Sequence, residues 1–209
     1  HVTFTYAGAG APSLKDISFQ AMPGETIGII GGTGSGKSTL VSLIPRFYDP
    51  QDGQVYMDGE NVTEYTRKSI GEKVGIVQQR SVLFQGSIRD NLKWGDENAT
   101  DEDIWKAIEI AQAKEVVEGK PGKLDFQLEQ NGRNLSGGQK QRLTIARALV
   151  KKPEILILDD SASTLDFATD AALRKAIHGL EGKMTTFLVS QRVAGIKQAD
   201  KILVLGNGE

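Results

Sequence analysis

The sequence Gly31-Gly32-Thr33-Gly34-Ser35-Gly36-Lys37-Ser38 decides the fold of this chain. It matches the pattern G-x-x-x-x-G-K-[ST] and lies between a short apolar run, TIGIIG (26–31), and a segment with helical spacing. Glycines at these positions let backbone N–H groups surround phosphate oxygens, and the helix N-terminus adds a favourable dipole. We therefore expect a nucleotide-binding loop in which Lys37 reaches the β- and γ-phosphates and the Ser38 hydroxyl ligates Mg²⁺.

Strands and helices alternate along the chain on both sides of this loop. Besides residues 26–31, apolar or alternating runs predict strands at 2–6, 14–19, 54–59, 73–77, 155–159, 185–190 and 201–206. Helical spacing predicts helices at 101–117, with Thr100 as N-cap, at 136–152 and at about 168–180. The expected fold is therefore α/β, with a P-loop NTPase (RecA-like) core and a mostly parallel sheet.

The helical stretch in the middle of the sequence indicates how this fold is organised. We expect a single domain, residues 1–209. Residues 1–86 and 151–209 would form the nucleotide-binding core with an N-terminal antiparallel β subdomain, and residues 87–150 an inserted α-helical subdomain.

The composition narrows the class of protein. The chain has 25 Lys plus Arg against 27 Asp plus Glu, a formal net charge of −2, which argues against a general nucleic-acid binder. It has no cysteine, and therefore no disulfide framework or thiolate metal site. No apolar run approaches the roughly 18 residues needed to span a bilayer. Glycine is frequent, 24 of 209 residues, so the backbone turns sharply or approaches something closely at several places.

Two adjacent acidic residues follow a buried strand. The run ILILD (155–159) ends in Asp159, and Asp160 comes next. In a P-loop fold, an aspartate at the carboxyl end of such a strand holds Mg²⁺ through water, so we predict this role for Asp159. The alternative is that the two acids only cap the end of the strand.

A second glycine motif opens the helix expected at 136–152. In Leu135-Ser136-Gly137-Gly138-Gln139, the pattern S-x-x-Q predicts a capping box between Ser136 and Gln139. A capping box alone does not explain the two glycines in the first turn, because each glycine lowers helix propensity by about 1 kcal/mol relative to alanine. They are explained if an anionic ligand approaches the bared N–H groups.

Together these motifs resemble the nucleotide-binding domain of ATP-binding-cassette (ABC) transporters. Segments similar to the exporter branch are RFYDPQDGQVYMDG (46–59), VQQRSVLFQGSIRDNL (77–92), NLSGGQKQRLTIARAL (134–149), STLD (163–166) and ADKILVL (199–205). The resemblance implies two such domains that enclose two Mg-ATP head to tail, each ATP between one phosphate loop and the other domain's LSGGQ. It also implies transmembrane domains as partners, no nucleic acid, and a place at the cytoplasmic face of the cell membrane as part of a longer membrane protein.

The resemblance assigns further residues to ATP. Tyr6, in the pattern V-x-F-x-Y, would stack on adenine, unless it is an ordinary strand aromatic. Gln79 would touch Mg²⁺ and communicate with the membrane domains, with Gln78 as the alternative register. Residues 163–166 would cross the dimer interface. The expected ATP-binding residues are Tyr6, Gly32, Thr33, Gly34, Ser35, Gly36, Lys37, Ser38, Thr39, Gln79, Ser136, Gly137, Gly138 and Gln139. The expected metal-binding residues are Ser38, Gln79 and Asp159.

Two catalytic positions depart from the family pattern. Asp160 stands where the family has a general-base glutamate, and Gln191 stands where it has a histidine that contacts the γ-phosphate. The aspartate stem falls short by about an ångström, which can lower a rate roughly a hundredfold. Glutamine can hydrogen-bond phosphate but carries no charge. A third departure is 129–132, EQNG, where exporters often have GERG in a loop that faces the membrane domains.

Loss at both positions resembles one subunit of heterodimeric exporters. We therefore expect a degenerate ATP site that hydrolyses weakly, and an LSGGQ that completes the active site of a non-identical partner. One alternative is a homodimeric exporter ATPase in which Asp160 is a slow base. Another is a soluble ABC protein that acts on nucleic acid or ribosomes, which the net charge of −2 disfavours.

Overall fold

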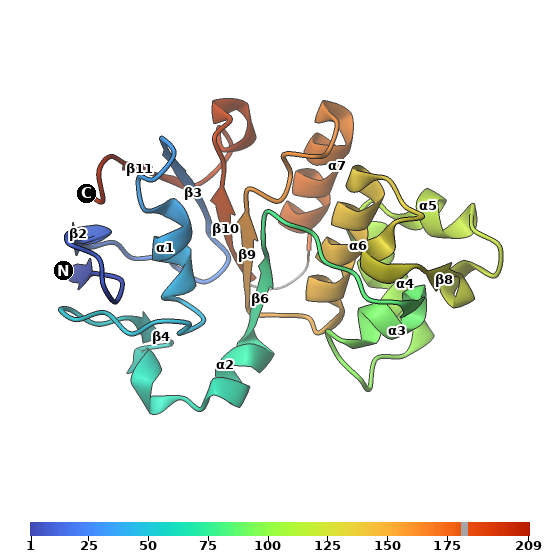
Figure 1. Cartoon of the computed structure of the whole chain (residues 1–209), viewed down its shortest axis with the longest axis horizontal. Coiled ribbons are helices and arrows are strands. Elements are labelled where there is room, and N and C mark those ends of the chain that lie inside the picture. The colour runs from blue at the N-terminus through green and yellow to red at the C-terminus, as the bar shows by residue number, and fades with distance from the viewer. Residues whose placement is uncertain (181–183) are drawn as a thin grey trace.

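The computed structural model describes residues 1–180 and 184–209, and a five-stranded parallel sheet forms its centre (Figure 1). The strand order is β11 (Lys201–Leu205), β3 (Thr26–Gly31), β10 (Thr185–Val189), β9 (Ile155–Asp159), β6 (Val74–Val77). The register pairs Leu205 with Gly31 and Val189 with Asp159, so the strands end at one edge. Ligands bind at this carboxyl edge in open α/β sheets. The predicted α/β fold with a mostly parallel sheet is confirmed.

Helices cover the two faces of the sheet. The helix α1 (Lys37–Ser42) lies on one face, and α6 (Gly137–Val150) and α7 (Phe167–His178) lie on the other (Figure 1). Because side chains alternate along a strand, β9 contributes to a hydrophobic cluster on each side. Ile157 packs in the cluster that contains Val41 of α1, whereas Leu156 and Leu158 pack in the cluster that contains Leu173 of α7.

Small antiparallel sheets flank the centre. They pair β1 (Val2–Phe4) with β2 (Leu14–Ile17), β4 (Tyr56–Met57) with β5 (Glu60–Asn61), and β7 (Gly86–Ser87) with β8 (Gln127–Leu128). The predicted strand 54–59 is wrong in part, because Asp58 and Gly59 have φ of 53° and 82° and turn the chain into a hairpin. A two-residue turn with positive φ at both positions matches the twist of hairpin strands.

The segment 87–150 is mainly helical, includes β8, and packs against the central sheet. It contains α3 (Ile88–Lys93), α4 (Asp101–Ile110), α5 (Lys114–Glu118) and α6. One hydrophobic cluster includes Leu92, Ile108 and Leu149 of this segment together with Leu156 and Leu188 of the central sheet. The remaining helical elements are α2 (Arg67–Lys73) and the short 3₁₀ turns Val62–Glu64, Lys123–Asp125, Gln130–Gly132 and Val193–Gly195. No helix among the described residues is long and apolar enough to cross a membrane.

The predicted single helix 101–117 is wrong, because α4 ends at Ile110 and α5 begins at Lys114. The Ala113 N–H bonds the Ile108 carbonyl at 2.9 Å, and the Gln112 N–H bonds the Glu109 carbonyl at 3.1 Å. These two bonds form a Schellman motif, in which Gln112 takes the left-handed conformation with φ 58°. The N-terminus agrees with the prediction, since Thr100 forms a capping box with Asp103.

Candidate functional site

The glycine loop connects β3 to α1 at the carboxyl edge of the sheet. Gly34 and Gly36 have φ of 77° and 101°, which side chains disfavour. An ideal Cβ on Gly32 or Gly34 would meet no described atom within 4 Å, so neither glycine is required for packing inside the chain. The outer side of the loop is therefore open, and its backbone can approach a ligand.

Lys37 is held inside this loop although its side chain is a cation. The residue is 8% exposed, and its Nζ donates to the carbonyl oxygens of Gly31 at 2.7 Å and Gly32 at 2.8 Å. Buried charges need such partners, because desolvation is otherwise costly. The loop thus keeps the ammonium group at the place where bound phosphates would lie.

Four of the predicted metal and catalytic residues meet beside the loop. The Ser38 hydroxyl donates to Asp159 Oδ1 at 3.0 Å, and Gln79 Nε2 donates to Asp160 Oδ2 at 3.2 Å. Burial raises the pKa of the Asp159 carboxyl above its ordinary value, while the Ser38 hydrogen bond opposes this. Ser38 and Asp159 therefore offer oxygen atoms close to one another, which suits Mg²⁺ held together with substrate phosphates, and Gln79 lies at the neighbouring Asp160.

Asp160 occupies a tight turn at the end of β9. Its φ is 47°, its N–H donates to the Val189 carbonyl at 2.9 Å, and its carbonyl accepts from the Ser163 N–H at 3.3 Å. Aspartate tolerates this left-handed conformation better than most residues. Burial raises the pKa of its carboxyl group, and the positive charges of Lys37 and Arg192 oppose this.

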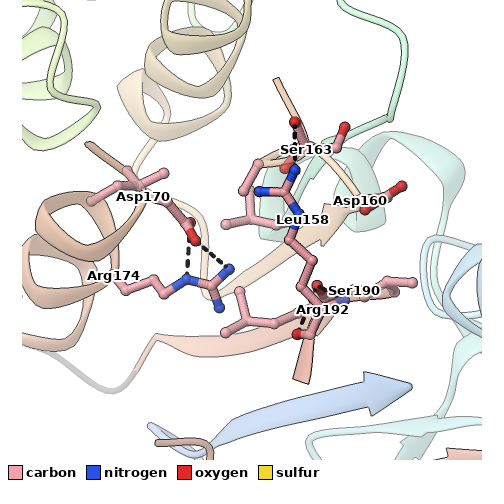
Figure 2. A pocket seen from close by; sticks show the side chains of 12 residues that line it. Leu158, Asp160, Ser163, Asp170, Arg174, Ser190 and Arg192 are labelled. Carbon is pink, nitrogen blue, oxygen red and sulfur yellow. Dashed lines mark hydrogen bonds and ion pairs between the residues drawn. The ribbon is translucent and has the colours of Figure 1, made fainter. Parts of the chain in front are cut away.

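Gln191 is exposed on the loop after β10, and within the described residues its side chain makes no hydrogen bond. Its neighbour Arg192, which no motif in the sequence singles out, donates from Nη2 to the Ser163 carbonyl at 3.4 Å. The sequence signal that could have identified Arg192 is its cationic side chain directly after Gln191. Figure 2 shows Arg192 between Ser190 and Ser163, close to the turn that carries Asp160.

Tyr6 lies at the side of the loop where α1 begins. Its hydroxyl is 3.0 Å from Thr39 Oγ1, and its ring makes edge contacts with Phe4 and Tyr48 at centroid distances of 4.8 and 5.2 Å. These contacts fix the half-buried ring next to α1. The stacking of Tyr6 on adenine stays a prediction.

The LSGGQ motif begins α6. The Ser136 hydroxyl accepts from the Gln139 N–H at 3.3 Å, and Gln139 Oε1 accepts from the Ser136 N–H at 3.1 Å, so the capping box is present. An ideal Cβ on Gly137 would meet no described atom within 4 Å. Because α6 and α1 lie on opposite faces of the sheet, the structure does not bring this motif to the chain's own phosphate loop (Figure 1).

Because the glycine loop joins a strand of a parallel sheet to the start of α1, the chain is a P-loop nucleotide-binding domain. The family described as "ABC transporter" matches residues 14–163, and the chain therefore belongs to it. It is an ABC-type ATPase domain that binds ATP. The expected family and enzyme class are confirmed at this level.

Curated proteins from two bacteria show how the chain relates to this family. It is 46% identical to the uncharacterized ABC transporter ATP-binding protein YfiB of Bacillus subtilis (strain 168), over 100% of this chain and 36% of that protein. It is 41% identical to a putative multidrug export ATP-binding/permease protein of Staphylococcus aureus (strain NCTC 8325), with the same coverage. The chain thus spans 36% of the length of these relatives.

A solved structure is also similar. A bacterial Atm1-family ABC exporter with ATP bound has a TM-score of 0.93 and 35% sequence identity to this chain. The match covers 99% of this chain and 36% of that chain.

Proposed function

We propose that this chain is the ATP-binding domain of a membrane exporter and that it dimerises around Mg-ATP to power export. The exporter proteins that it resembles support this proposal, because the chain matches 36% of their length and leaves room for membrane-spanning domains. The domain would then work at the cytoplasmic face of the cell membrane. Since these relatives are transporters, the alternative of a soluble protein that acts on nucleic acid is not carried forward.

A more specific proposal is that the chain's own ATP site is degenerate, which means that it lacks the catalytic glutamate and histidine of the family pattern. The residues for binding are intact, since Lys37, Ser38 and Asp159 lie together at the loop. The observation that carries the proposal is the position of Asp160, whose short carboxylate is bonded to Gln79 at the wall of the site. Gln191 adds no positive charge for the γ-phosphate. We therefore expect Mg-ATP to bind here and to be hydrolysed slowly.

The LSGGQ motif would serve a second, non-identical domain. The start of α6 and α1 lie on opposite faces of the sheet, so a phosphate bound by the bared N–H groups of this motif would come from a partner. That partner would carry the glutamate and the histidine that this chain lacks. The partner's ATP would then be hydrolysed with the help of Ser136, Gly137 and Gly138.

The membrane domains would contact the segment after Gln79. Phe84 and Trp94 are exposed and stacked with a centroid distance of 4.8 Å, and the Arg147 guanidinium lies 5.9 Å from the Phe84 ring. Exposed aromatic residues grouped in this way mark interaction surfaces. Phe84 lies in the loop that follows Gln79, and this connection would let a membrane domain sense the ATP site.

A comparison of two cap variants tests the role of LSGGQ. Ser136→Ala and Ser87→Ala each remove the serine of a capping box, so both should lower stability by about 1 kcal/mol. In the full-length protein assembled with its partner, Ser136→Ala should also reduce ATP hydrolysis severalfold, whereas Ser87→Ala should not. Equal hydrolysis by the two variants would show that Ser136 is only a cap.

The homodimeric alternative is favoured by one observation, the position of Asp160 next to Asp159 within reach of Gln79. Hydrolysis by this chain without the partner separates the two proposals. Negligible turnover alone and turnover after the partner is added support the heterodimer. Measurable turnover by this chain alone that Asp160→Asn abolishes supports the homodimer.

A further inference from the structure

A small cavity lies behind the turn that carries Asp160. It offers about 20 Å³ to the centre of a water-sized sphere, and it is bounded by β9, the turn 160–163, α7 and the loop after β10 (Figure 2). A cavity needs about 10–15 Å³ on this measure to hold one water molecule. The space therefore suits one small occupant and is far too small for a nucleotide.

Two polar atoms at this cavity are buried without a partner. Ser161 is 1% exposed, and neither its Oγ nor Nη1 of Arg174 has a hydrogen-bond partner within the described part of the chain. Both residues line the cavity. A guanidinium can only donate, whereas a hydroxyl can donate and accept. The occupant must therefore accept from Arg174 and can exchange a hydrogen bond with Ser161, which water does.

The charges at the cavity favour a neutral occupant. Arg174 pairs with Asp170 through Nε at 2.9 Å and Nη2 at 3.0 Å, and Arg192 and Asp160 supply one further charge of each sign. Two arginines and two aspartates leave no net charge, so an anion or a metal cation would gain little here.

We propose that this cavity holds one ordered water that bridges Arg174 Nη1 and Ser161 Oγ, and that Arg174 is thereby a positioning residue for the turn that carries Asp160. Asp170 fixes the guanidinium on α7, the water transmits its position to Ser161, and Ser161 follows Asp160 directly. Arg174 would thus act on the ATP site through Ser161 and not by touching the nucleotide.

Arg174 also supports the loop that follows Gln191. An ideal Cβ on Gly195 would lie 2.6 Å from Arg174 Nη2, so the loop passes close to the guanidinium, which would have to shift to admit a side chain there. One side chain of α7 thus lies beside the loop after Gln191 and, through the proposed water, acts on the turn that carries Asp160. Any effect of Arg174 on ATP hydrolysis rests on the proposed role of Asp160. The bridging water and the support that it gives the turn do not depend on that role.

Hydrogen exchange tests the hold on the turn. Arg174→Met removes the donors and keeps much of the volume, Ser161→Ala removes the other end of the bridge, and Lys175→Met makes the same change at an exposed site of α7. We expect the Ser163 amide, which bonds the Asp160 carbonyl, to exchange about tenfold faster in the first two variants and unchanged in the third. Unchanged exchange in Arg174→Met and Ser161→Ala would refute the proposal.

A charge swap separates positioning from plain stabilisation. In Asp170→Arg/Arg174→Asp the ion pair can re-form, but residue 174 then carries a carboxylate, which cannot donate a hydrogen bond to the water as the Arg174 guanidinium does. We expect thermal stability to recover relative to Arg174→Asp alone while the Ser163 amide still exchanges fast. Recovery of both would show that the pair is only structural. A high-resolution crystal structure must also show density for the water between the two atoms, and an empty cavity would overturn the bridge. None of these readouts depends on hydrolysis, so a failed ATPase proposal would leave them unaffected.

Discussion

Replacing Asp160 by glutamate is expected to raise ATP hydrolysis at this chain's own site about a hundredfold. In the wild-type chain, Asp160 Oδ2 lies 3.2 Å from Gln79 Nε2, at the wall beside the phosphate loop. One added methylene moves the carboxylate about an ångström toward the place of the attacking water. A displacement of that size changes rates about a hundredfold, which corresponds to about 2.7 kcal/mol of activation free energy.

The assay measures phosphate release by the full-length protein assembled with the proposed partner, whose own catalytic base is removed. The hydrolysis that remains then reports on the site of this chain. Asp160→Asn is the matched control, because it keeps the length of the side chain and removes the base. Asp160→Glu/Gln191→His should gain more than Asp160→Glu, since histidine adds a group that can carry positive charge. If Asp160→Glu hydrolyses ATP no faster than the wild type, the argument from stem length is refuted.

Three further results are expected for the stability of the chain. Thr100→Ala removes a capping box and should lower the free energy of unfolding by about 1 kcal/mol in urea titrations. The pKa of Asp103 is lowered by the Lys152 ammonium first, and then by the side chain and backbone of Thr100. The Asp103 carboxylate therefore stabilises the fold at pH values above its ordinary pKa of about 3.9, and this contribution is lost as the pH falls below that value. Urea titrations between pH 6 and pH 2 should show this loss, and Asp103→Asn should reduce it. Gly31→Ala should cost about 2 kcal/mol or more in thermal unfolding, because its Cβ would collide with the Leu205 carbonyl oxygen.

The sequence predicted the parts of the site that lie in one continuous segment. The phosphate loop, Asp159 at the end of a buried strand and the Ser136–Gln139 capping box each depend on neighbours only a few residues away, so their spacing carries the information. The bond from Ser38 to Asp159 follows from the parallel sheet, because parallel strands end at one edge.

What the sequence missed depends on unusual backbone or on distant segments. The break after Ile110 requires a left-handed Gln112, where glycine is the usual signal. The helices α2 and α3 have only seven and six residues, too few for a periodic pattern, and Thr66 and Ser87 cap them. The cavity beside Asp160 joins residues of the turn, α7 and the loop after β10, which meet only when the order of the strands is known.

The shared hydrophobic cluster limits how the helical segment can move during an ATP cycle. Because Ile108 and Leu149 pack in the same cluster as Leu156 and Leu188, the segment is not suspended on a flexible linker. A hinge rotation would open this packed contact to water. A displacement of α6 relative to β6 and β9 that keeps this core closed would be a shear, in which packed side chains slide by small steps.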